Sequence, residues 1–190
     1  FDIANKFSFV KNETNEYKIL IGNSADSTNN YVDAFHYIKK NLKEAYFVHS
    51  ILSYGDVFGK YIALKSGKKY FKDRFCPVLD YMDRTSYLNF INSMNIVVMF
   101  HNRQQAVGNI ITALVLGKPV FMTADNVVYK MLKSIGVSSV YDIEMIANRP
   151  ISEYIDEARD KRKNTIEIIK NVYSKELRLK YLRELLTIQH

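Results

Sequence analysis

The residues best suited to chemistry in this chain form one polar segment, His101-Asn102-Arg103-Gln104-Gln105. This segment follows an apolar run from Asn95 to Phe100 that is typical of a buried strand, and a helix is predicted to begin near Ala106 or Gly108. The free N–H groups and the dipole of a helix N-terminus can hold a phosphate, and an arginine adds a planar, permanently charged donor. The alternative is an ordinary strand-to-helix connection with a solvated arginine.

The surrounding sequence alternates between strand-like and helix-like segments. Short apolar runs bounded by turn residues predict strands over 17–21, 45–52, 69–76, 95–100, 118–122 and 138–141. Helical spacing predicts helices over 31–42, 57–65, 85–94 and 125–135 and after residue 106, with Gly67 closing the second helix and Pro77 ending the third strand. Such alternation is typical of right-handed βαβ units. We therefore predict an α/β fold, a Rossmann-like doubly wound parallel sheet of about six strands.

Ligands of such a sheet bind beyond the carboxyl ends of its strands, where four polar loops are expected to converge. The first two loops supply glycines for close backbone approach and polar side chains that can reach a phosphate. The last loop is the polar segment together with the helix N-terminus that follows it. The candidate ligand-binding residues are Gly22, Asn23, Ser24, Ser53, Tyr54, Gly55, Tyr81, His101, Asn102, Arg103, Gln104, Gln105, Gly108 and Asn109.

Several polar residues in these loops have a structural alternative. Ser24, Asp26 and Asp56 suit helix capping as well as contact with a phosphate or a sugar. His101 stands alone at a strand end, where a histidine is more often structural than catalytic. Tyr81 either lies against a nucleobase or fills the core.

The sequence changes character after Pro150. Residues 151–188 contain no glycine or proline, are dense in charge of both signs and carry spaced apolar residues, among them Leu182, Leu185 and Leu186. One or two amphipathic helices are predicted, which either wrap the sheet domain or dock a partner domain. We expect an N-terminal extension over 1–16, a nucleotide-binding domain over 17–149 and a helical segment over 150–190. Because the chain starts at Phe1, we expect it to be part of a longer protein.

Net charge and residue composition restrict the classes of binding partner and cofactor that we expect. The 27 basic and 20 acidic residues give a net charge of +7, which favours a nucleotide, a lipid phosphate or a membrane surface, and nucleic acid is not expected. The four histidines are scattered, Cys76 is the only cysteine and no Asp-x-Asp occurs, so metal-independent chemistry without a cofactor is expected. A basic run from Lys60 to Arg74 is either a solvated face or a patch for anionic lipid.

Two sets of motifs resemble known families. The order of Tyr81-Met82, Asn95-Ile96-Val97-Val98 and Gly117-Lys118-Pro119-Val120 is similar to the nucleotide-sugar-binding half of GT-B glycosyltransferases, in which two Rossmann-like domains face each other. More narrowly, residues 17–146 resemble the bacterial TDP-N-acetylfucosamine:lipid II N-acetylfucosaminyltransferase family, also described as 4-alpha-L-fucosyltransferases. The motifs that carry this resemblance are ILIGNSADSTNN, ILSYGD, FCPVLDYMD and FHNRQQAVGNIITALVLGKPVF.

The resemblance implies transfer of 4-acetamido-4,6-dideoxygalactose (Fuc4NAc) from a dTDP-sugar donor to a polyprenyl-diphosphate-linked saccharide. The product would serve enterobacterial common antigen or a related surface polysaccharide. This chain would be the donor-binding half, inactive alone, with the acceptor and the catalytic base reached through a missing N-terminal half. The expected location is cytoplasmic, peripheral on the inner face of the bacterial inner membrane.

The donor diphosphate is expected to meet Arg103, the N–H groups near Gly108 and Asn109, and Ser24, with His101 as a weaker candidate. Many retaining GT-B enzymes carry two glutamates before the last motif. Aligned on Gly117, those positions hold Gln104 and Thr112, so carboxylates are not available for that role. Two alternative functions stay open: a non-catalytic nucleotide- or phosphosugar-binding module, and a nucleotide-sugar epimerase or hydrolase.

Overall fold

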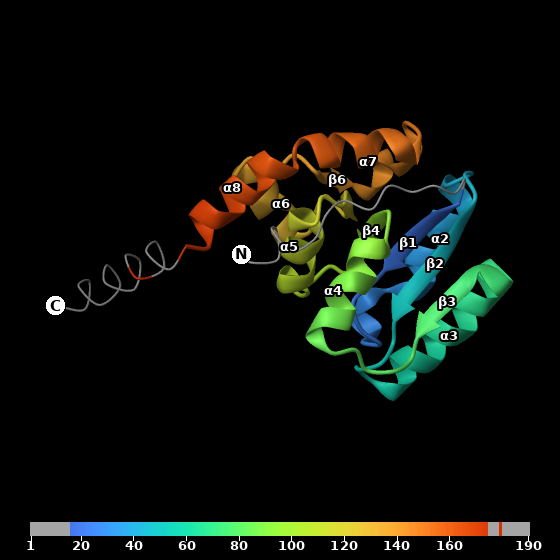
Figure 1. Cartoon of the computed structure of the whole chain (residues 1–190). Helices are drawn as coiled ribbons and strands as arrows, with labels where there is room; N and C mark the ends of the chain where they lie inside the picture. The colour runs from blue at the N-terminus through green and yellow to red at the C-terminus, as the bar shows by residue number, and fades with distance from the viewer. Residues whose placement is uncertain (1–15, 175–178, 180–190) are drawn as a thin grey trace.

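The computed structural model describes residues 16–174 and residue 179 of the chain. Within them, six parallel strands form one sheet in the order β3-β2-β1-β4-β5-β6 (Figure 1). The strands are β1 (Tyr17–Ile21), β2 (Tyr46–Ile51), β3 (Phe75–Val78), β4 (Ile96–Met99), β5 (Val120–Met122) and β6 (Val140–Asp142). β4 lies at the centre, between β1 and β5, and all four of its residues are buried. The predicted doubly wound parallel sheet is confirmed.

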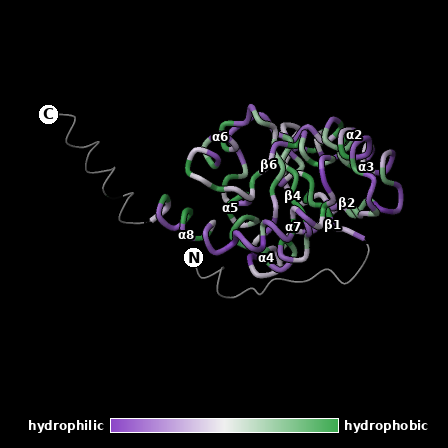
Figure 2. Tube along the Cα trace, turned by 90° about the horizontal axis from the view of Figure 1, so that it is seen from above, coloured by the Kyte–Doolittle hydropathy of each residue, from purple (hydrophilic) through white to green (hydrophobic). Residues whose placement is uncertain are grey.

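Helices cover both faces of the sheet. The α-helices are α2 (Tyr31–Asn41), α3 (Val57–Phe71), α4 (Arg84–Ser93), α5 (Val107–Val115), α6 (Val127–Ser134), α7 (Ile151–Asp160) and α8 (Arg162–Val172), and the short 3-10 helices are η1 (Ser27–Asn29), η2 (Lys72–Arg74) and η3 (Ile143–Ala147). One hydrophobic cluster joins the sheet to α2, α3 and α7, and the other joins it to α4, α5, α6 and α8. In Figure 2 the strands are largely hydrophobic and the outer helices carry the hydrophilic segments.

The structure corrects the sequence prediction between residues 57 and 78. α3 does not close at Gly67 but continues to Phe71, so the predicted strand over 69–76 is wrong over 69–74, and only residues 75 and 76 of that range belong to β3. Gly67 serves packing instead, because a Cβ atom built there would lie 2.4 Å from the Phe75 ring. Pro77 does not end the third strand but lies inside β3, and an edge strand tolerates a residue without an N–H donor.

The two C-terminal helices pack onto the sheet domain and share its core. Tyr154 of α7 is fully buried and contacts the rings of Phe121 and Tyr141 edge-on, at centroid distances of 4.9 and 4.8 Å. Ile169 of α8 is equally buried, in the cluster of α5. The alternative in which these helices wrap the sheet therefore holds for 151–172, while Leu182, Leu185 and Leu186 lie outside the described residues, as does nearly all of the 1–16 extension.

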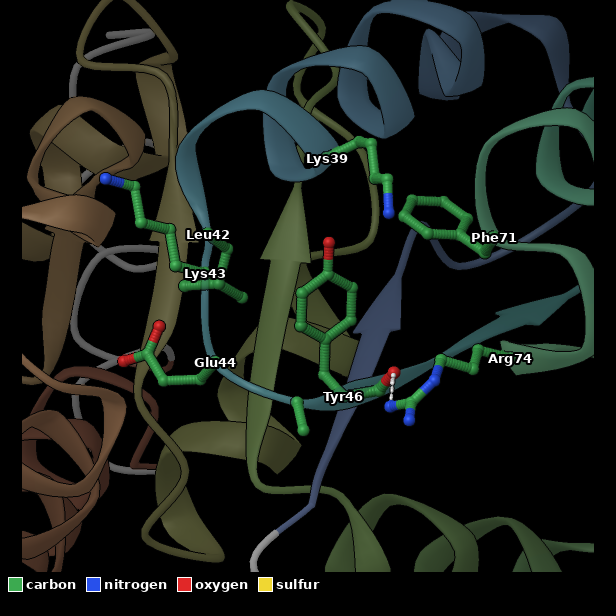
Figure 3. Close-up of a pocket in the computed structure, with 8 residues that line it drawn as sticks. Lys39, Leu42, Lys43, Glu44, Tyr46, Phe71 and Arg74 are labelled. Carbon is green, nitrogen blue, oxygen red and sulfur yellow. Dashed lines mark hydrogen bonds between the residues drawn. The ribbon is translucent and has the colours of Figure 1, made fainter.

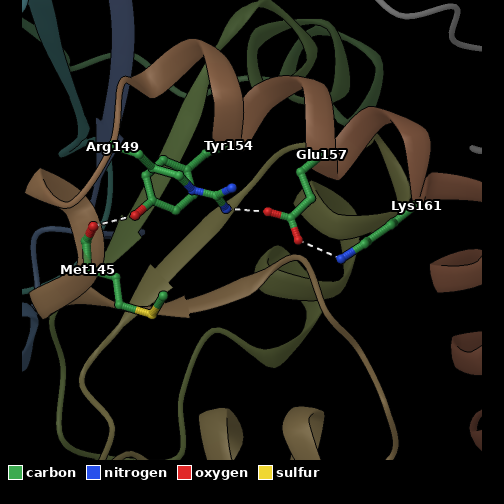
Figure 4. Close-up of polar contacts among 5 residues, drawn as sticks. All are labelled: Met145, Arg149, Tyr154, Glu157 and Lys161. Carbon is green, nitrogen blue, oxygen red and sulfur yellow. Dashed lines mark hydrogen bonds and ion pairs between the residues drawn. The ribbon is translucent and has the colours of Figure 1, made fainter.

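A row of alternating charges fixes α7 to the loop before it (Figure 4). The Arg149 guanidinium lies 4.0 Å from the centroid of the Tyr154 ring and pairs with the Glu157 carboxylate, which also accepts a hydrogen bond of 2.5 Å from Lys161. Burial alone would raise the pKa of Glu157, but the hydrogen bonds from Lys161 and Arg149 outweigh it and lower that pKa to about 2. Glu157 is therefore ionised at neutral pH and holds α7 to the preceding loop.

None of the described helices is long and apolar enough to span a membrane.

Candidate functional site

Three of the four expected loops are joined at the carboxyl edge of the sheet. The loop after β1 contacts the loop after β2 through Ala25 N, which donates to Tyr54 O at 2.6 Å, and through Tyr54 Oη, which donates to Asn23 O at 2.7 Å. The loop after β1 also contacts the loop after β4, because Asn30 Nδ2 donates to Phe100 O at 3.2 Å. The convergence predicted from the βαβ pattern thus exists for the loops after β1, β2 and β4.

The glycines of the first two loops serve this loop packing. Gly22 has a φ of +73°, and a Cβ atom there would lie 2.4 Å from the hydroxyl oxygen of Tyr31. A Cβ atom on Gly55 would lie 2.6 Å from Asp26 N, and one on Gly59 would lie 2.1 Å from Ala25 O. The protein's own backbone and side chains therefore account for Gly22 and Gly55, without any need for a close ligand.

Ser24 and Asp56 are also engaged in holding the loops. Ser24 is buried, and its carbonyl oxygen accepts from the Tyr31 hydroxyl at 2.7 Å and from Asn29 Nδ2 at 3.0 Å. Asp56 is the N-cap of α3, bonded to Gly59 N, and its second oxygen accepts from Ser27 N at 2.8 Å. Those backbone hydrogen bonds lower the pKa of Asp56. The capping alternative therefore describes Asp56, and Asp26 likewise caps η1.

The polar segment after β4 is held by its own backbone and by one distant side chain. Asn126 Nδ2 donates to His101 O at 2.6 Å and lies 3.3 Å from Arg103 O, while Asn126 Oδ1 caps α6 by accepting from Val128 N at 2.8 Å. Arg103 O also accepts from Gln105 N at 3.0 Å. The backbone of this loop is therefore fixed, whereas the side chains of Asn102, Arg103 and Gln104 are exposed.

His101 lies inside this arrangement and is completely buried. Its Nδ1 lies 2.9 Å from Arg103 O and 3.2 Å from Asn126 Nδ2. Because Arg103 O can only accept, and the two amide protons of Asn126 can go to His101 O and Arg103 O, we assign the imidazole proton to Nδ1. Burial lowers the pKa of the imidazole, and the neutral ring then keeps a lone pair on Nε2. These contacts give His101 a structural role in shaping the loop, and its contact with a donor stays a prediction.

The N-terminus of α5 is open toward solvent. Ala106, the N-cap residue, has a φ of 57° and makes no capping hydrogen bond through its side chain. The first N–H groups of a helix have no partner within the helix, so those of Val107, Gly108 and Asn109 are available to a ligand. A Cβ atom on Gly108 would meet nothing within 4 Å. In contrast to Gly22 and Gly55, this glycine is not required by the packing of the protein.

Three of the buried polar atoms that lack a partner within the described residues follow neighbouring strands at this edge of the sheet. Among the described residues, Asn23 Oδ1, His101 Nε2 and Thr123 Oγ1 are buried without a hydrogen-bond partner. They follow β1, β4 and β5, which are neighbours in the centre of the sheet. Because buried polar atoms are normally paired, three such atoms beyond adjacent strands indicate a site that a polar ligand would complete.

Arg103 contributes an exposed positive charge at this edge. Its guanidinium is close enough to Asp26 to help lower the pKa of that carboxyl, although hydrogen bonds from Thr28 are the larger cause. Thr28 Oγ1 lies 2.6 Å from Asp26 Oδ1 and 2.8 Å from the side-chain amide of Gln105. Since one hydroxyl proton cannot serve both, the amide of Gln105 must donate to Thr28 when Thr28 donates to Asp26.

The remaining candidates lie at the rim. Tyr81 is 84% exposed, so the alternative in which it fills the core is wrong. Ser53 is half-buried, and the ring of Tyr54 is half exposed next to Asn23. Sequence reasoning missed Thr28, Asn29 and Asn126. The signal for Asn126 was present, since an asparagine directly before the apolar run Val127-Val128-Tyr129 is a common helix N-cap.

Among the hollows of the described structure, two illustrate the contrast between the two edges of the sheet. One of about 370 Å³ lies beyond β4, β5 and β6 and is lined by residues that include Phe100, Thr123 and Asp142. Another of about 280 Å³ lies at the opposite, amino edge, where Tyr46 begins β2 (Figure 3). Within the described ranges, no three His, Cys, Asp or Glu side chains gather as a metal site, and metal independence stays a prediction.

Several solved structures share the fold of this chain at low sequence identity. The chain is similar to an alpha,alpha-trehalose-phosphate synthase (UDP-forming) from Burkholderia xenovorans, with a TM-score of 0.66 and 7% identity over 90% of this chain and 43% of that one. It is similar to TarM, with a TM-score of 0.65 and 16% identity over 94% of this chain and 36% of that one. The chain thus spans less than half of these proteins.

One solved structure is an isolated C-terminal domain, and this chain covers nearly all of it. The C-terminal domain of LpcC, a glycosyl transferase group 1 family protein from Francisella tularensis, matches with a TM-score of 0.60 and 14% identity over 88% of this chain and 96% of that one. At these identities the likeness shows the fold, one Rossmann-like half of a GT-B architecture. No curated protein sequence matches the chain. The sequence profile of one family matches residues 3–184, and the chain therefore belongs to the 4-alpha-L-fucosyltransferase family, glycosyl transferase group 56.

Proposed function

We propose that this chain is the donor-binding part of a glycosyltransferase that moves Fuc4NAc from a dTDP-sugar to a polyprenyl-diphosphate-linked saccharide. Membership of the 4-alpha-L-fucosyltransferase family supports the reaction class. The match to nearly all of an isolated C-terminal domain, but to less than half of longer glycosyltransferases, supports the assignment to one half of the enzyme. The sugar, the nucleobase and the lipid-linked acceptor come from the family resemblance.

The observation that carries the proposal is the uncapped N-terminus of α5, with open space in front of Gly108. A diphosphate placed there would accept from the N–H groups of Val107, Gly108 and Asn109 and would be stabilised by the helix dipole. The exposed Arg103 guanidinium, on a loop whose backbone is fixed, would pair with the outer oxygens.

The same arrangement would assist the departure of the nucleoside diphosphate. As the bond between the sugar and the diphosphate breaks, negative charge accumulates on the leaving phosphate oxygens. Donors that are already oriented toward those oxygens stabilise that charge without reorganisation, which lowers the barrier. Arg103 and the α5 N–H groups fill this role in the proposal, and no metal ion is needed for it.

Recognition of the rest of the donor is assigned to the rim. Tyr81 would stack on the thymine, and the amides of Asn102, Gln104 and Gln105 would bind ribose or sugar hydroxyl groups. Asn23 Oδ1, a buried acceptor without a partner in the described residues, would accept one of those hydroxyl protons. The catalytic base and the acceptor site would be contributed by a facing domain, at the cytoplasmic side of the bacterial inner membrane.

Calorimetric titration of the chain with dTDP tests the proposal. We expect binding that persists in EDTA and is stronger for dTDP than for dTMP, because the second phosphate adds contacts at α5 and Arg103. Absence of dTDP binding by the folded chain would overturn the proposal. Loss of binding in EDTA would overturn the metal-independent mode while leaving a donor site in place.

A further inference from the structure

One face of α3 is exposed and combines apolar with basic side chains. Val57, Phe58 and Tyr61 are 86%, 69% and 56% exposed, more than the 43% of Val32 on the neighbouring helix α2. Successive residues of an α-helix are rotated by about 100°, so these three share an arc of about 120° with the exposed lysines of the same helix. Those lysines are Lys65, Lys68 and Lys69.

No carboxylate balances this face. None of the three lysines forms an ion pair within the part of the chain that the structure describes. Two of them instead lie near aromatic rings, with Lys65 Nζ 5.7 Å from the centroid of Tyr61 and Lys69 Nζ 5.7 Å from that of Tyr70. The single carboxylate at the start of the helix, Asp56, is turned inward to Gly59 N and Ser27 N.

The basic character continues beyond the end of the helix. A hollow of about 590 Å³ follows Lys69 and is lined by Lys39, Lys72 and Arg74, with Asp73 as an acidic residue beside them. In Figures 1 and 2, α3 lies on the outside of the molecule, at the end of the sheet away from α8. The face is therefore accessible over the full length of the helix, about 22 Å for 15 residues.

We propose that this α3 face docks on the surface of an anionic phospholipid bilayer. A helix that lies in the membrane interface places aromatic and aliphatic side chains at the boundary between headgroups and acyl chains, and keeps its lysines among the headgroup phosphates. Val57, Phe58 and Tyr61 suit the first role, and the three lysines suit the second. An uncharged bilayer would leave the lysines without partners, so charge complementarity selects an anionic one.

Docking through α3 would bring the candidate donor site near the bilayer. The helix begins at the carboxyl edge of the sheet, where Asp56 Oδ2 accepts from Ser27 N of the loop after β1 at 2.8 Å. A lipid-linked acceptor would therefore reach this edge without leaving the membrane. The docking itself does not depend on donor binding and is tested separately from it.

Co-sedimentation of the chain with vesicles provides the first test. Binding is expected to vesicles that contain phosphatidylglycerol and not to vesicles of phosphatidylcholine alone, with weaker binding at high salt. Charge reversal in the triple variant Lys65→Glu, Lys68→Glu, Lys69→Glu should lower the partition coefficient by at least about a hundredfold, since each lysine near the surface contributes about 1 kcal/mol. Equal loss in a matched control of three exposed lysines elsewhere, Lys133→Glu, Lys163→Glu, Lys170→Glu, would overturn the proposal.

A fluorescence test locates the contact itself. The sequence contains no tryptophan, so Phe58→Trp introduces a single reporter on the proposed face. Its emission should shift to shorter wavelength with anionic vesicles, whereas Val127→Trp, at a 59% exposed position on α6, should not shift. An unshifted Phe58→Trp spectrum on vesicles that sediment the protein would overturn the assignment to α3. Equal binding of the triple variant and the unmodified chain to the anionic vesicles would overturn it as well.

Discussion

The side-chain amide of Asn126 donates a hydrogen bond of 2.6 Å to the carbonyl oxygen of His101. The two residues lie beyond neighbouring strands, β4 and β5, and both are buried. Through this bond the N-cap of α6 holds the loop that carries Arg103. The shape of the candidate site therefore depends on a residue that does not face it.

Two substitutions at Asn126 separate its roles. Asn126→Ala removes both the cap of α6 and the bonds to the loop, and should lower the free energy of unfolding by about 2–4 kcal/mol. Asn126→Asp keeps the capping acceptor but places a carboxylate oxygen against the carbonyl oxygens of His101 and Arg103. We expect it to be as destabilising as the alanine variant in urea unfolding. If capping were the main role, Asn126→Asp would match the unmodified chain.

Arg103→Ala tests the proposed diphosphate contact. The loss of one charge-assisted pair should weaken dTDP binding by about 1.5–3 kcal/mol, or one to two orders of magnitude, with little change in stability because the side chain is exposed. Arg103→Lys should recover only part of the affinity. The control is Arg74→Ala, which removes the same charge at the amino edge, where Arg74 pairs with Glu16. Equal loss in both variants would indicate general attraction rather than a site.

Gly108→Ala distinguishes a ligand contact from a packing constraint. A Cβ atom at this position meets nothing within 4 Å, so the unfolding free energy should stay constant or rise by up to about 1 kcal/mol. The added methyl group would nevertheless stand where a phosphate approaches the backbone, and dTDP affinity should fall by about tenfold. Gly59→Ala is the contrasting case, because its Cβ atom would lie 2.1 Å from Ala25 O and must destabilise the fold. Unchanged dTDP affinity in Gly108→Ala would remove α5 from the site.

The lowered pKa of Lys118 should make the free energy of unfolding depend on pH. Lys118 is buried and donates to Asn92 O at 2.6 Å, and burial together with the nearby Arg162 lowers its pKa from 10.5 to about 8. Between these two pH values the unfolded chain binds more protons than the folded one, so stability rises with pH, by up to about 1.4 kcal/mol per unit. Urea unfolding of the unmodified chain minus that of Lys118→Met should show this slope. A flat difference between pH 8 and 10.5 would contradict the lowered pKa of this buried lysine.

The sequence by itself determined the α/β class and the doubly wound parallel sheet. These features follow from local patterns, because apolar runs, helical spacing and turn residues act within a few neighbouring positions. It also identified the polar segment after the strand over 96–99. The sequence failed around Gly67, where glycine is a good helix stop in isolation. A glycine lies inside α3 because the Phe75 ring packs against it and leaves no room for a Cβ atom. That contact joins the helix to the following strand, and a local sequence pattern does not reveal it.

The roles of the individual site residues were decided only by tertiary structure. Gly22, Gly55 and Gly108 look alike in sequence, yet the first two are required by neighbouring protein atoms and the third faces open space. His101 is buried, with its Nδ1 in contact with Arg103 O, whereas the Arg103 side chain is exposed. Such differences arise from contacts between loops that follow different strands, and a single sequence does not encode which loop atoms will meet until the sheet has brought them together.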